Sequence, residues 1–298
     1  MNTQTVLVTG SSSGFGFQLT QQLLREGYTV FATMRHLDGQ NAGAAAQLRA
    51  AAQDQKGKLQ LLELDVRDES SVNTAVESML RQVEKIDVLI NNAGIGGGGF
   101  TEAFTPDQFQ ETFDVNVFGI QRVMRAVLPS MRERRAGLVI NISSLQGRVV
   151  IPFAGAYTAS KFALEGLAES YHYELAPLGV DIVIVEPGGF LTGYWSKLMA
   201  PKDADRANGY APDTSLPDNL WNGVIANLQS EQAPDMQILV SAIVQLIETP
   251  TGKRPLRTVV DPMMGGGAPT AVNQVSESVQ RELLQALGLG NRISVQER

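Results

Sequence analysis

Residues 5–16 read TVLVTGSSSGFG, a short apolar run followed at once by a turn of glycine and serine. The apolar residues 5–8 are typical of a buried strand, and an amphipathic helical pattern follows from residue 16. A glycine-rich turn between a strand and a helix presents free backbone N–H groups at the helix N-terminus, where a phosphate group binds well. This stretch predicts the first strand, turn and helix of an α/β fold that binds a dinucleotide. Its spacing departs from the G-x-G-x-x-G fingerprint, and a purely structural turn of glycine and serine is the alternative.

Similar apolar runs recur along the chain, at residues 29–32, 59–64, 88–90, 138–142 and 181–185. Their continuous apolar character predicts strands buried on both faces, as in a parallel sheet. Helical patterns separate the runs, at residues 16–26, 71–84, 106–134 and 157–176. This alternation predicts one doubly wound parallel sheet, a Rossmann fold of the α/β class.

The pattern changes after residue 188. Prolines at positions 201, 212, 217 and 234 interrupt residues 191–234, and a helix at 236–247 and a strand at 256–260 then resume the alternation. We therefore expect a catalytic domain at 1–262 with a substrate lid at 191–234. The remaining residues, 263–298, form a C-terminal extension with a helix at 276–287.

Composition excludes several classes of function. A formal net charge of −7 argues against a nucleic-acid partner, because such binding depends on clustered Lys and Arg. The chain begins without a basic and apolar leader and contains no apolar stretch of membrane-spanning length, so we expect a cytoplasmic protein without a membrane partner. With no cysteine and only His36 and His172, no metal site is expected.

The turn also satisfies the G-x-S-x-G pattern of a serine hydrolase, with Ser12 as its nucleophile. That chemistry requires a histidine farther along the chain, and His172 is the only one. It stands in the middle of a helical pattern, which disfavours this alternative.

Polar motifs follow the fourth and fifth predicted strands. Asn91-Asn92-Ala93-Gly94 comes after one, and Asn141-Ile142-Ser143-Ser144 after the other. Both motifs fall at the carboxyl edge, where open α/β sheets bind ligands. Tyr157 and Lys161 follow on one face of the next helix, four residues apart. Each motif alone has a structural explanation, as a turn, a cap, packing or a surface charge, but the ordered set indicates an active site.

In this order the motifs resemble the short-chain dehydrogenase/reductase family over about residues 5–192. The resemblance rests on the loop Thr9–Gly16, on Asn91–Gly94, on Asn116, on Ser144 with Tyr157-x-x-x-Lys161, and on Pro187-Gly188 with Thr192. Thr33-Met34-Arg35 and residues 162–166 are similar to the NADP-preferring hydroxysteroid and retinol dehydrogenase-like members of the family.

The resemblance implies an enzyme that transfers a hydride between NADP(H) and a carbonyl or secondary alcohol. In such an enzyme Tyr157 is the proton donor or acceptor, Ser144 binds the substrate oxygen, Lys161 binds the nicotinamide ribose and favours the tyrosinate, and Asn116 holds a water. The implied cofactor contacts are Gly10, Ser12, Ser13, Gly14, Phe15, Gly16, Arg35, Asp65, Val66, Asn92, Ala93, Gly94, Tyr157, Lys161, Pro187, Gly188 and Thr192.

The end of the second strand predicts the choice of cofactor. Members that prefer NAD place an acidic residue where this chain has Met34, whereas Arg35 can bind the 2′-phosphate of NADP, with Ser13 or His36 as helpers. Asp65 would contact the adenine amine; its structural alternative is a capping carboxylate.

The sequence also supports expectations about the lid, the oligomeric state and an alternative function. The lid residues Tyr194, Trp195, Leu198, Met199, Tyr210 and Trp221 either line a pocket for a bulky apolar substrate or only pack the lid. A homo-oligomer, dimer or tetramer, is expected through the helices at 106–134 and 157–176. A non-catalytic NADP(H) sensor on the same fold is the alternative function.

Overall fold

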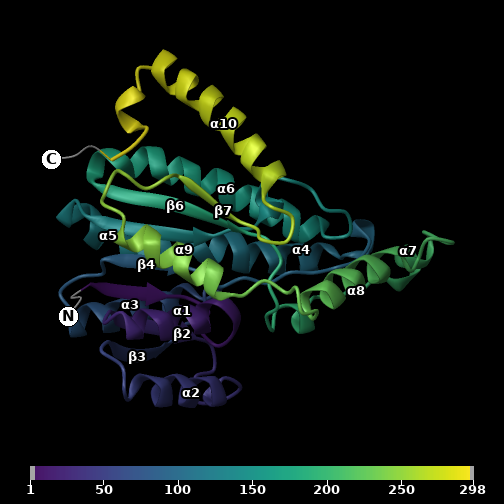
Figure 1. Ribbon diagram of the computed structural model, residues 1–298, viewed down its shortest axis with the longest axis horizontal. Coiled ribbons are helices and arrows are strands. Elements are labelled where there is room, and N and C mark those ends of the chain that lie inside the picture. Colours follow the sequence, from purple (N-terminus) through teal and green to yellow (C-terminus); the bar gives the residue numbers. More distant parts are fainter. Residues whose placement is uncertain (1–3, 296–298) are drawn as a thin grey trace.

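Seven strands form one sheet in the computed structural model, which describes residues 4–295, and every strand runs parallel to its neighbours (Figure 1). The strands are β1 (Thr5–Val8), β2 (Thr29–Met34), β3 (Lys58–Glu63), β4 (Val88–Asn91), β5 (Gly137–Ile142), β6 (Val180–Pro187) and β7 (Arg257–Val260). Their order across the sheet is β3-β2-β1-β4-β5-β6-β7. The doubly wound Rossmann fold expected from the sequence is thereby confirmed.

Helices connect the strands, because a parallel pair needs a crossover that returns the chain to the same edge. They are α1 (Gly14–Arg25), α2 (Ala42–Ala52), α3 (Glu69–Gln82), α4 (Pro106–Phe113), α5 (Gly119–Arg134), α6 (Gly155–Leu175), α7 (Ala204–Asn208), α8 (Leu216–Leu228), α9 (Gln237–Glu248) and α10 (Gly267–Ala286). The first three residues of the expected domain and the last three of the expected extension lie outside the described residues.

Alternate residues of each central strand point into two separate cores. Val6 and Val8 of β1 pack with α1, α2 and α9 on one face, while Leu7 packs with α3, α5 and α6 on the other. Both faces of the central strands are therefore buried, which explains their unbroken apolar sequence.

The structure corrects four details. Strand β3 lies at the sheet edge, with three of its six residues exposed and the other three only partly buried, so its expected full burial is wrong. The single helix expected at 106–134 runs without a break but includes a π-helical turn, Asp114–Phe118. The lid contains a regular helix, α8, of 13 residues. Helix α10 begins nine residues before the expected start at 276, because Gly266 has φ +63° and ends the preceding turn.

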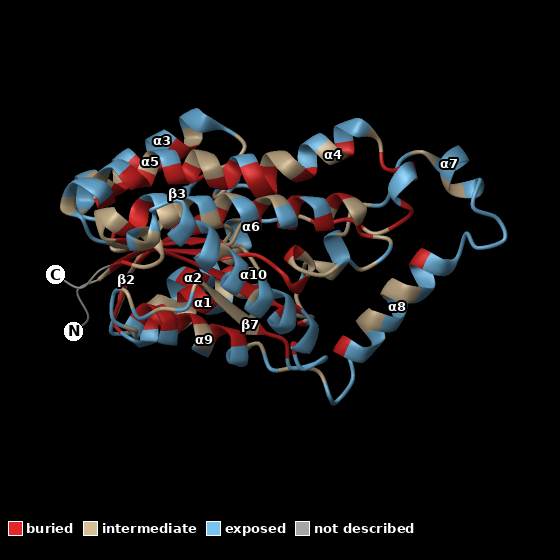
Figure 2. Ribbon diagram, turned by 90° about the horizontal axis from the view of Figure 1, so that it is seen from above, coloured by how far each residue is buried: buried red, intermediate tan, exposed pale blue. Residues whose placement is uncertain are grey.

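The direction of chain progression reverses at β1, which has β2 on one side and β4 on the other. At such a point the loops after neighbouring strands diverge and leave a crevice at the carboxyl edge. Helices α7 and α8 extend beyond this edge, away from the main body (Figure 2).

Candidate active site

A cavity of about 460 Å³ opens at this carboxyl edge. Its walls come from the turn after β1, the ends of β2 to β6, the first turns of α6, and the lid. The volume lies within the range of about 300–1,000 Å³ that is usual for ligand pockets.

The turn after β1 has the shape that a phosphate group requires. Gly10 has φ +70°, and a Cβ atom there would lie 2.8 Å from the Cα of Ala93. The side-chain amide of Asn92 donates to the carbonyl oxygens of Thr9 and Gly10, at 2.9 and 3.0 Å, and so fastens the turn to the loop after β4. Ser13, the N-cap residue of α1, makes no side-chain cap bond, and the first turn carries no acidic residue. The backbone N–H groups of this helix end therefore suit an anionic ligand.

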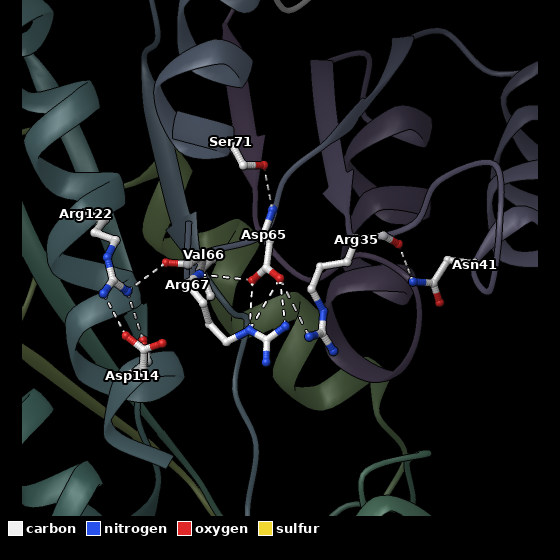
Figure 3. Close-up of polar contacts among 8 residues, drawn as sticks. All are labelled: Arg35, Asn41, Asp65, Val66, Arg67, Ser71, Asp114 and Arg122. Carbon is white, nitrogen blue, oxygen red and sulfur yellow. Dashed lines mark hydrogen bonds and ion pairs between the residues drawn. The ribbon is translucent and has the colours of Figure 1, made fainter. Parts of the chain in front are cut away.

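Two arginines and one carboxylate lie beside the end of β2 (Figure 3). Asp65 accepts hydrogen bonds from the Arg67 guanidinium, with Nη2 at 2.9 Å and Nε at 3.2 Å. Arg35 is more loosely paired, with Nη1 3.8 Å from the same carboxylate and 45% of its side chain exposed. Burial raises the pKa of Asp65, but the arginines outweigh this effect and lower it. Arg35 is therefore a cavity-lining cation that can turn toward an anionic ligand.

Tyr157 and Ser144 meet on the opposite wall. Ser144 follows β5 at the start of a short 3₁₀ turn and is almost fully buried. Its hydroxyl accepts from the Gln146 N–H at 3.1 Å and lies beside the phenol of Tyr157 on α6. The second neighbour of the phenol is the hydroxyl of Tyr194 in the lid. Burial raises the pKa of Tyr157 above its ordinary value, while the two hydroxyl partners act in the opposite direction.

Lys161 lies one helical turn beyond Tyr157 and is buried. Its Nζ donates to the carbonyl oxygen of Ile142 at 2.8 Å and lies 5.7 Å from the centre of the Tyr157 ring. Burial lowers the pKa of this ammonium to about 8, although the carboxylate of Glu165 partly restores it. A positive charge is thus held close to the phenol.

Asn116 occupies the π-helical turn between α4 and α5. Its Oδ1 accepts from the backbone N–H of Ile95, and its Nδ2 donates to the Ile95 carbonyl and to the Ser160 hydroxyl, each at 2.9 Å. The widened turn brings this amide between the loop after β4 and α6, a role in keeping with the frequent use of π-turns at functional sites.

Most of the residues expected from the sequence share the cavity. Those that line it are Gly10, Ser12, Ser13, Gly14, Phe15, Met34, Arg35, Asp65, Val66, Asn92, Ala93, Gly94, Ser144, Tyr157, Lys161, Pro187, Gly188 and Thr192. Gly16 and Asn116 lie behind the wall. A Cβ atom on Gly16 would lie 2.5 Å from the Asn92 amide, so this glycine serves the turn and not the cavity surface. His36, considered as a helper of Arg35, is also outside the lining.

The lid residues divide into two groups. Tyr194, Trp195, Leu198 and Trp221 line the cavity, whereas Met199 and Tyr210 do not. The ring of Tyr210 stacks on Phe100, with 4.0 Å between ring centres, and its hydroxyl donates to the Glu102 carboxylate at the surface.

Sequence reasoning missed the glycine run Gly96–Gly99, on which the lid lies. A Cβ atom on Gly96 would lie 1.8 Å from the hydroxyl oxygen of Tyr194, and one on Gly98 would lie 2.8 Å from Trp221 Nε1. Gly99 has φ +148° and leaves room for Pro201. Four consecutive glycines after a strand are a visible signal, but their partners lie about 100 residues away and could not be paired with them from the sequence.

Ser12 has no histidine partner of the kind that a hydrolase needs. The ring nitrogens of His172 lie 2.9 and 2.8 Å from the carbonyl oxygens of Ile182 and Ile293, and His172 lines no part of the cavity. Within residues 4–295, no cluster of three or more His, Cys, Asp or Glu side chains could hold a metal ion. No helix in that same part of the chain is both long and apolar enough to cross a membrane.

Comparison with known proteins agrees with this geometry. Residues 4–203 match the short chain dehydrogenase family. Human retinol dehydrogenase 8 is 40% identical over 215 residues, which cover 71% of this chain and 67% of that protein. Human 17-beta-hydroxysteroid dehydrogenase type 1 is 40% identical over 197 residues, covering 65% and 59%.

Two further similarities extend the comparison. The 3-ketodihydrosphingosine reductase of Bacteroides thetaiotaomicron is 39% identical over 194 residues, covering 65% of this chain and 66% of that protein, just under two thirds. A crystal structure of a short-chain dehydrogenase from Streptomyces avermitilis superimposes with a TM-score of 0.75 at 32% identity, covering 97% and 99% of the two chains.

Proposed function

The chain belongs to the short-chain dehydrogenase/reductase family, and from this premise we propose that it is an NADP(H)-dependent oxidoreductase acting on a carbonyl or secondary alcohol. One observation carries the proposal: the Tyr157 phenol, the Ser144 hydroxyl and the buried Lys161 ammonium converge on the cavity whose far wall is the glycine-rich turn before α1. This arrangement provides an acid, an oxygen-binding hydroxyl and a nearby positive charge on one wall, with an anion-binding helix end on the other.

Each of these residues has its own role in the reaction, set by its position in the cavity. A nicotinamide cofactor, when bound, supplies or accepts the hydride. The Ser144 hydroxyl holds the carbonyl oxygen, and Tyr157 gives that oxygen a proton as negative charge develops on it. Lys161 stabilises the resulting tyrosinate, because an ammonium in a buried site acts strongly on a neighbouring charge. Alcohol oxidation uses the same groups in reverse.

Arg35 supports a preference for NADP(H). It stands at the end of β2 with much of its guanidinium exposed, and the preceding residue is a buried methionine instead of a carboxylate. A planar guanidinium forms charge-assisted hydrogen bonds to a phosphate monoester.

The lid supports a bulky apolar substrate. Trp195 and Trp221 pack with their ring centres 6.2 Å apart, and both line the cavity together with Leu198. The similar proteins carry names that refer to retinol, a hydroxysteroid and a ketodihydrosphingosine, each of which has a large hydrocarbon part. We extend this class of substrate to the present chain.

The proposal is tested by NADPH consumption against ketones, aldehydes, quinones and steroids, with Tyr157→Phe as the decisive variant. This change keeps the ring and removes the hydroxyl, so turnover should fall by about 10²–10⁴-fold while the dissociation constant for NADPH stays close to native. Lys161→Ala should lower turnover and also weaken the binding of NADPH. If Tyr157→Phe retains more than about a tenth of native turnover, too small a loss for a missing general acid, the mechanism is wrong.

A further inference from the structure

A second tyrosine faces Tyr157 across the cavity. Tyr194 lies in the lid two residues after Thr192, and its hydroxyl is close enough to the hydroxyl of Tyr157 to shift the pKa of that phenol. The two ring centres are 5.9 Å apart, with 55° between the ring planes. The phenol expected to exchange a proton with substrate therefore has two hydroxyl neighbours, Ser144 on its own wall and Tyr194 on the lid.

The backbone around Tyr194 is held in place on both sides. The Met199 N–H donates to the Gly96 carbonyl at 2.9 Å, and the Gly98 N–H donates to the Met199 carbonyl at 3.1 Å. A further bond comes from the Trp195 side chain, whose indole N–H donates to the Phe190 carbonyl at 2.8 Å. Tyr194 thus belongs to a packed segment and not to a freely moving loop.

The space for its hydroxyl depends on a glycine. A Cβ atom on Gly96 would lie only 1.8 Å from Tyr194 Oη, so any side chain at position 96 would displace the phenol from Tyr157. The T-shaped packing of Tyr194 on Trp195, with 5.5 Å between ring centres, holds the ring from the other side. Ring, hydroxyl and backbone are all positioned toward Tyr157.

The pKa values of the two phenols decide which hydroxyl is the donor in this contact. Burial and the neighbouring Tyr157 raise the pKa of Tyr194 well above its ordinary value, so Tyr194 keeps its proton when Tyr157 loses one. Tyr194 is then the donor and the Tyr157 oxygen the acceptor. When a substrate oxygen takes the Ser144 hydroxyl, Tyr194 stays as a donor to Tyr157, and such a bond is strongest when the acceptor is charged.

We propose that Tyr194 is a further catalytic residue, which stabilises the tyrosinate form of Tyr157 through a hydrogen bond from its own hydroxyl. This inference rests on the proposed function and deepens it. During carbonyl reduction the Tyr157 proton moves to the substrate oxygen, and the negative charge left on Tyr157 Oη is shared with the Tyr194 O–H. Tyr194 itself transfers no proton. Alcohol oxidation gains most, because there Tyr157 must start as the tyrosinate.

The test is the pH profile of kcat/KM for alcohol oxidation in Tyr194→Phe, which keeps the ring and loses the hydroxyl. Loss of a donor to a charged acceptor should move the rising limb of the profile to higher pH by about one to two units. Oxidation at neutral pH should then fall by about 10–100-fold, with carbonyl reduction at low pH less affected. Tyr210→Phe, a lid variant whose hydroxyl contacts only Glu102 at the surface, should leave the profile in place.

A second measurement separates this inference from the proposed function. The protein labelled with ¹³C at the ring carbon that bears each tyrosine hydroxyl has six signals, and Tyr157→Phe identifies the signal of Tyr157. In the binary complex with NADP⁺, its titration should move upward in Tyr194→Phe. An unchanged titration and an unchanged profile would overturn the role of Tyr194 while leaving the enzyme assignment intact. If no substrate pair is turned over, the titration still decides whether the two phenols are coupled.

The alternative role for the Tyr194 hydroxyl is to block the position of the substrate oxygen. The same variant distinguishes this role from the stabilisation of the tyrosinate. If Tyr194 only fills the position of the substrate oxygen, Tyr194→Phe should lower KM and leave the pH profile unchanged. That result would contradict the inference.

Discussion

At the scale of single residues, Arg35 is the side chain on which we expect the choice between the two nicotinamide cofactors to depend. Its guanidinium is shared between solvent and Asp65, at 3.8 Å, while Arg67 makes the shorter contacts with that carboxylate. Arg67 thereby neutralises Asp65, and Arg35 loses little when it turns toward a phosphate group. Surface ion pairs of this length contribute little by themselves.

We therefore expect Arg35→Ala to weaken NADP(H) binding by about 10–150-fold and to leave NAD(H) binding nearly unchanged. Arg35→Lys should restore part of the loss, because a lysine keeps the charge but not the two-pronged geometry. Titration calorimetry with both cofactors measures this, and Arg49→Ala, an exposed change on α2, is the control. Equal native affinity for NAD(H) and NADP(H) would contradict the assignment.

Residue positions could be predicted where the spacing is local. Tyr157 and Lys161 share a helix face, so their sequence distance already places them together. Ser144 could be added because neighbouring parallel strands end at one edge. Tyr194 could not be placed against Tyr157, because its position depends on the fold of the lid and on the space above Gly96. Arg67 was not predicted, because its role is to pair with the Asp65 carboxylate, and that pairing is visible only in the folded structure.

At the scale of elements, the π-helical turn Asp114–Phe118 shows where periodicity alone fails. Both α4 and α5 follow the helical pattern, so the sequence predicts one continuous helix. The helix does continue, but it widens at this turn, and the Asn116 side-chain amide within the turn bonds to Ile95 and Ser160. Those partners come from the loop after β4 and from α6, and no local pattern announces them.

The lid consists of two parts that differ in attachment. Residues 194–199 are bonded to the glycine run through the backbone of Met199, whereas α8 is largely exposed and buries only Pro217 and Leu228 (Figure 2). Trp221 and Val224 of α8 nevertheless line the cavity. An element with few buried contacts opens at low free-energy cost, and ligand contacts can close it.

We expect amide hydrogen exchange in α8 to slow when NADP(H) and a substrate analogue bind together. Residues 194–199 should change less, because their backbone bonds already exist. Exchange monitored by mass spectrometry, with cofactor alone as the intermediate state, measures both segments. Protection of α8 that is unaffected by both ligands would show that this helix is not a moving lid.

At the scale of the whole molecule, a buried cluster of charges joins the last elements to the sheet. Arg257 of β7 contacts Glu165 at 2.9 Å and Glu169 at 2.6 Å on α6, and Glu186 of β6 at 3.5 Å. Asn273 of α10 donates to Glu186 at 2.8 Å. Burial, followed by the charge of Glu165, raises the pKa of Glu186 to about 7. Three carboxylates around one guanidinium favour a proton within the cluster.

This proton makes folding stability depend on pH. Glu186 binds it up to about pH 7 in the folded state, whereas the unfolded chain releases it near the ordinary value of 4.5. The contribution to stability is therefore complete below about pH 4.5, declines as pH rises, and is lost once pH passes about 7. Glu186→Gln, neutral at every pH, should be more stable than native protein at pH 8, with a smaller advantage at pH 5. Urea unfolding midpoints at both pH values test this, and an advantage that does not change with pH would contradict it.

Two exposed aromatic rings mark the surface through which we expect copies of the chain to associate. Phe118, in the π-helical turn before α5, is 53% exposed, and Phe162, on the adjoining α6, is 42% exposed. Two large apolar rings on helices that pack together suit a two-fold interface between copies of the chain, since most soluble oligomers are symmetric. We expect light scattering to show a dimer or tetramer at micromolar concentration, and the double change Phe118→Ser with Phe162→Ser to shift it toward monomer. Helix α10 offers the matched control, because its Val275 and Val279 are also well exposed, at 66% and 60%. Serine at those two positions should leave the mass unchanged. A native monomer would exclude association altogether, and loss of the oligomer only in the α10 variant would place the interface on that helix instead.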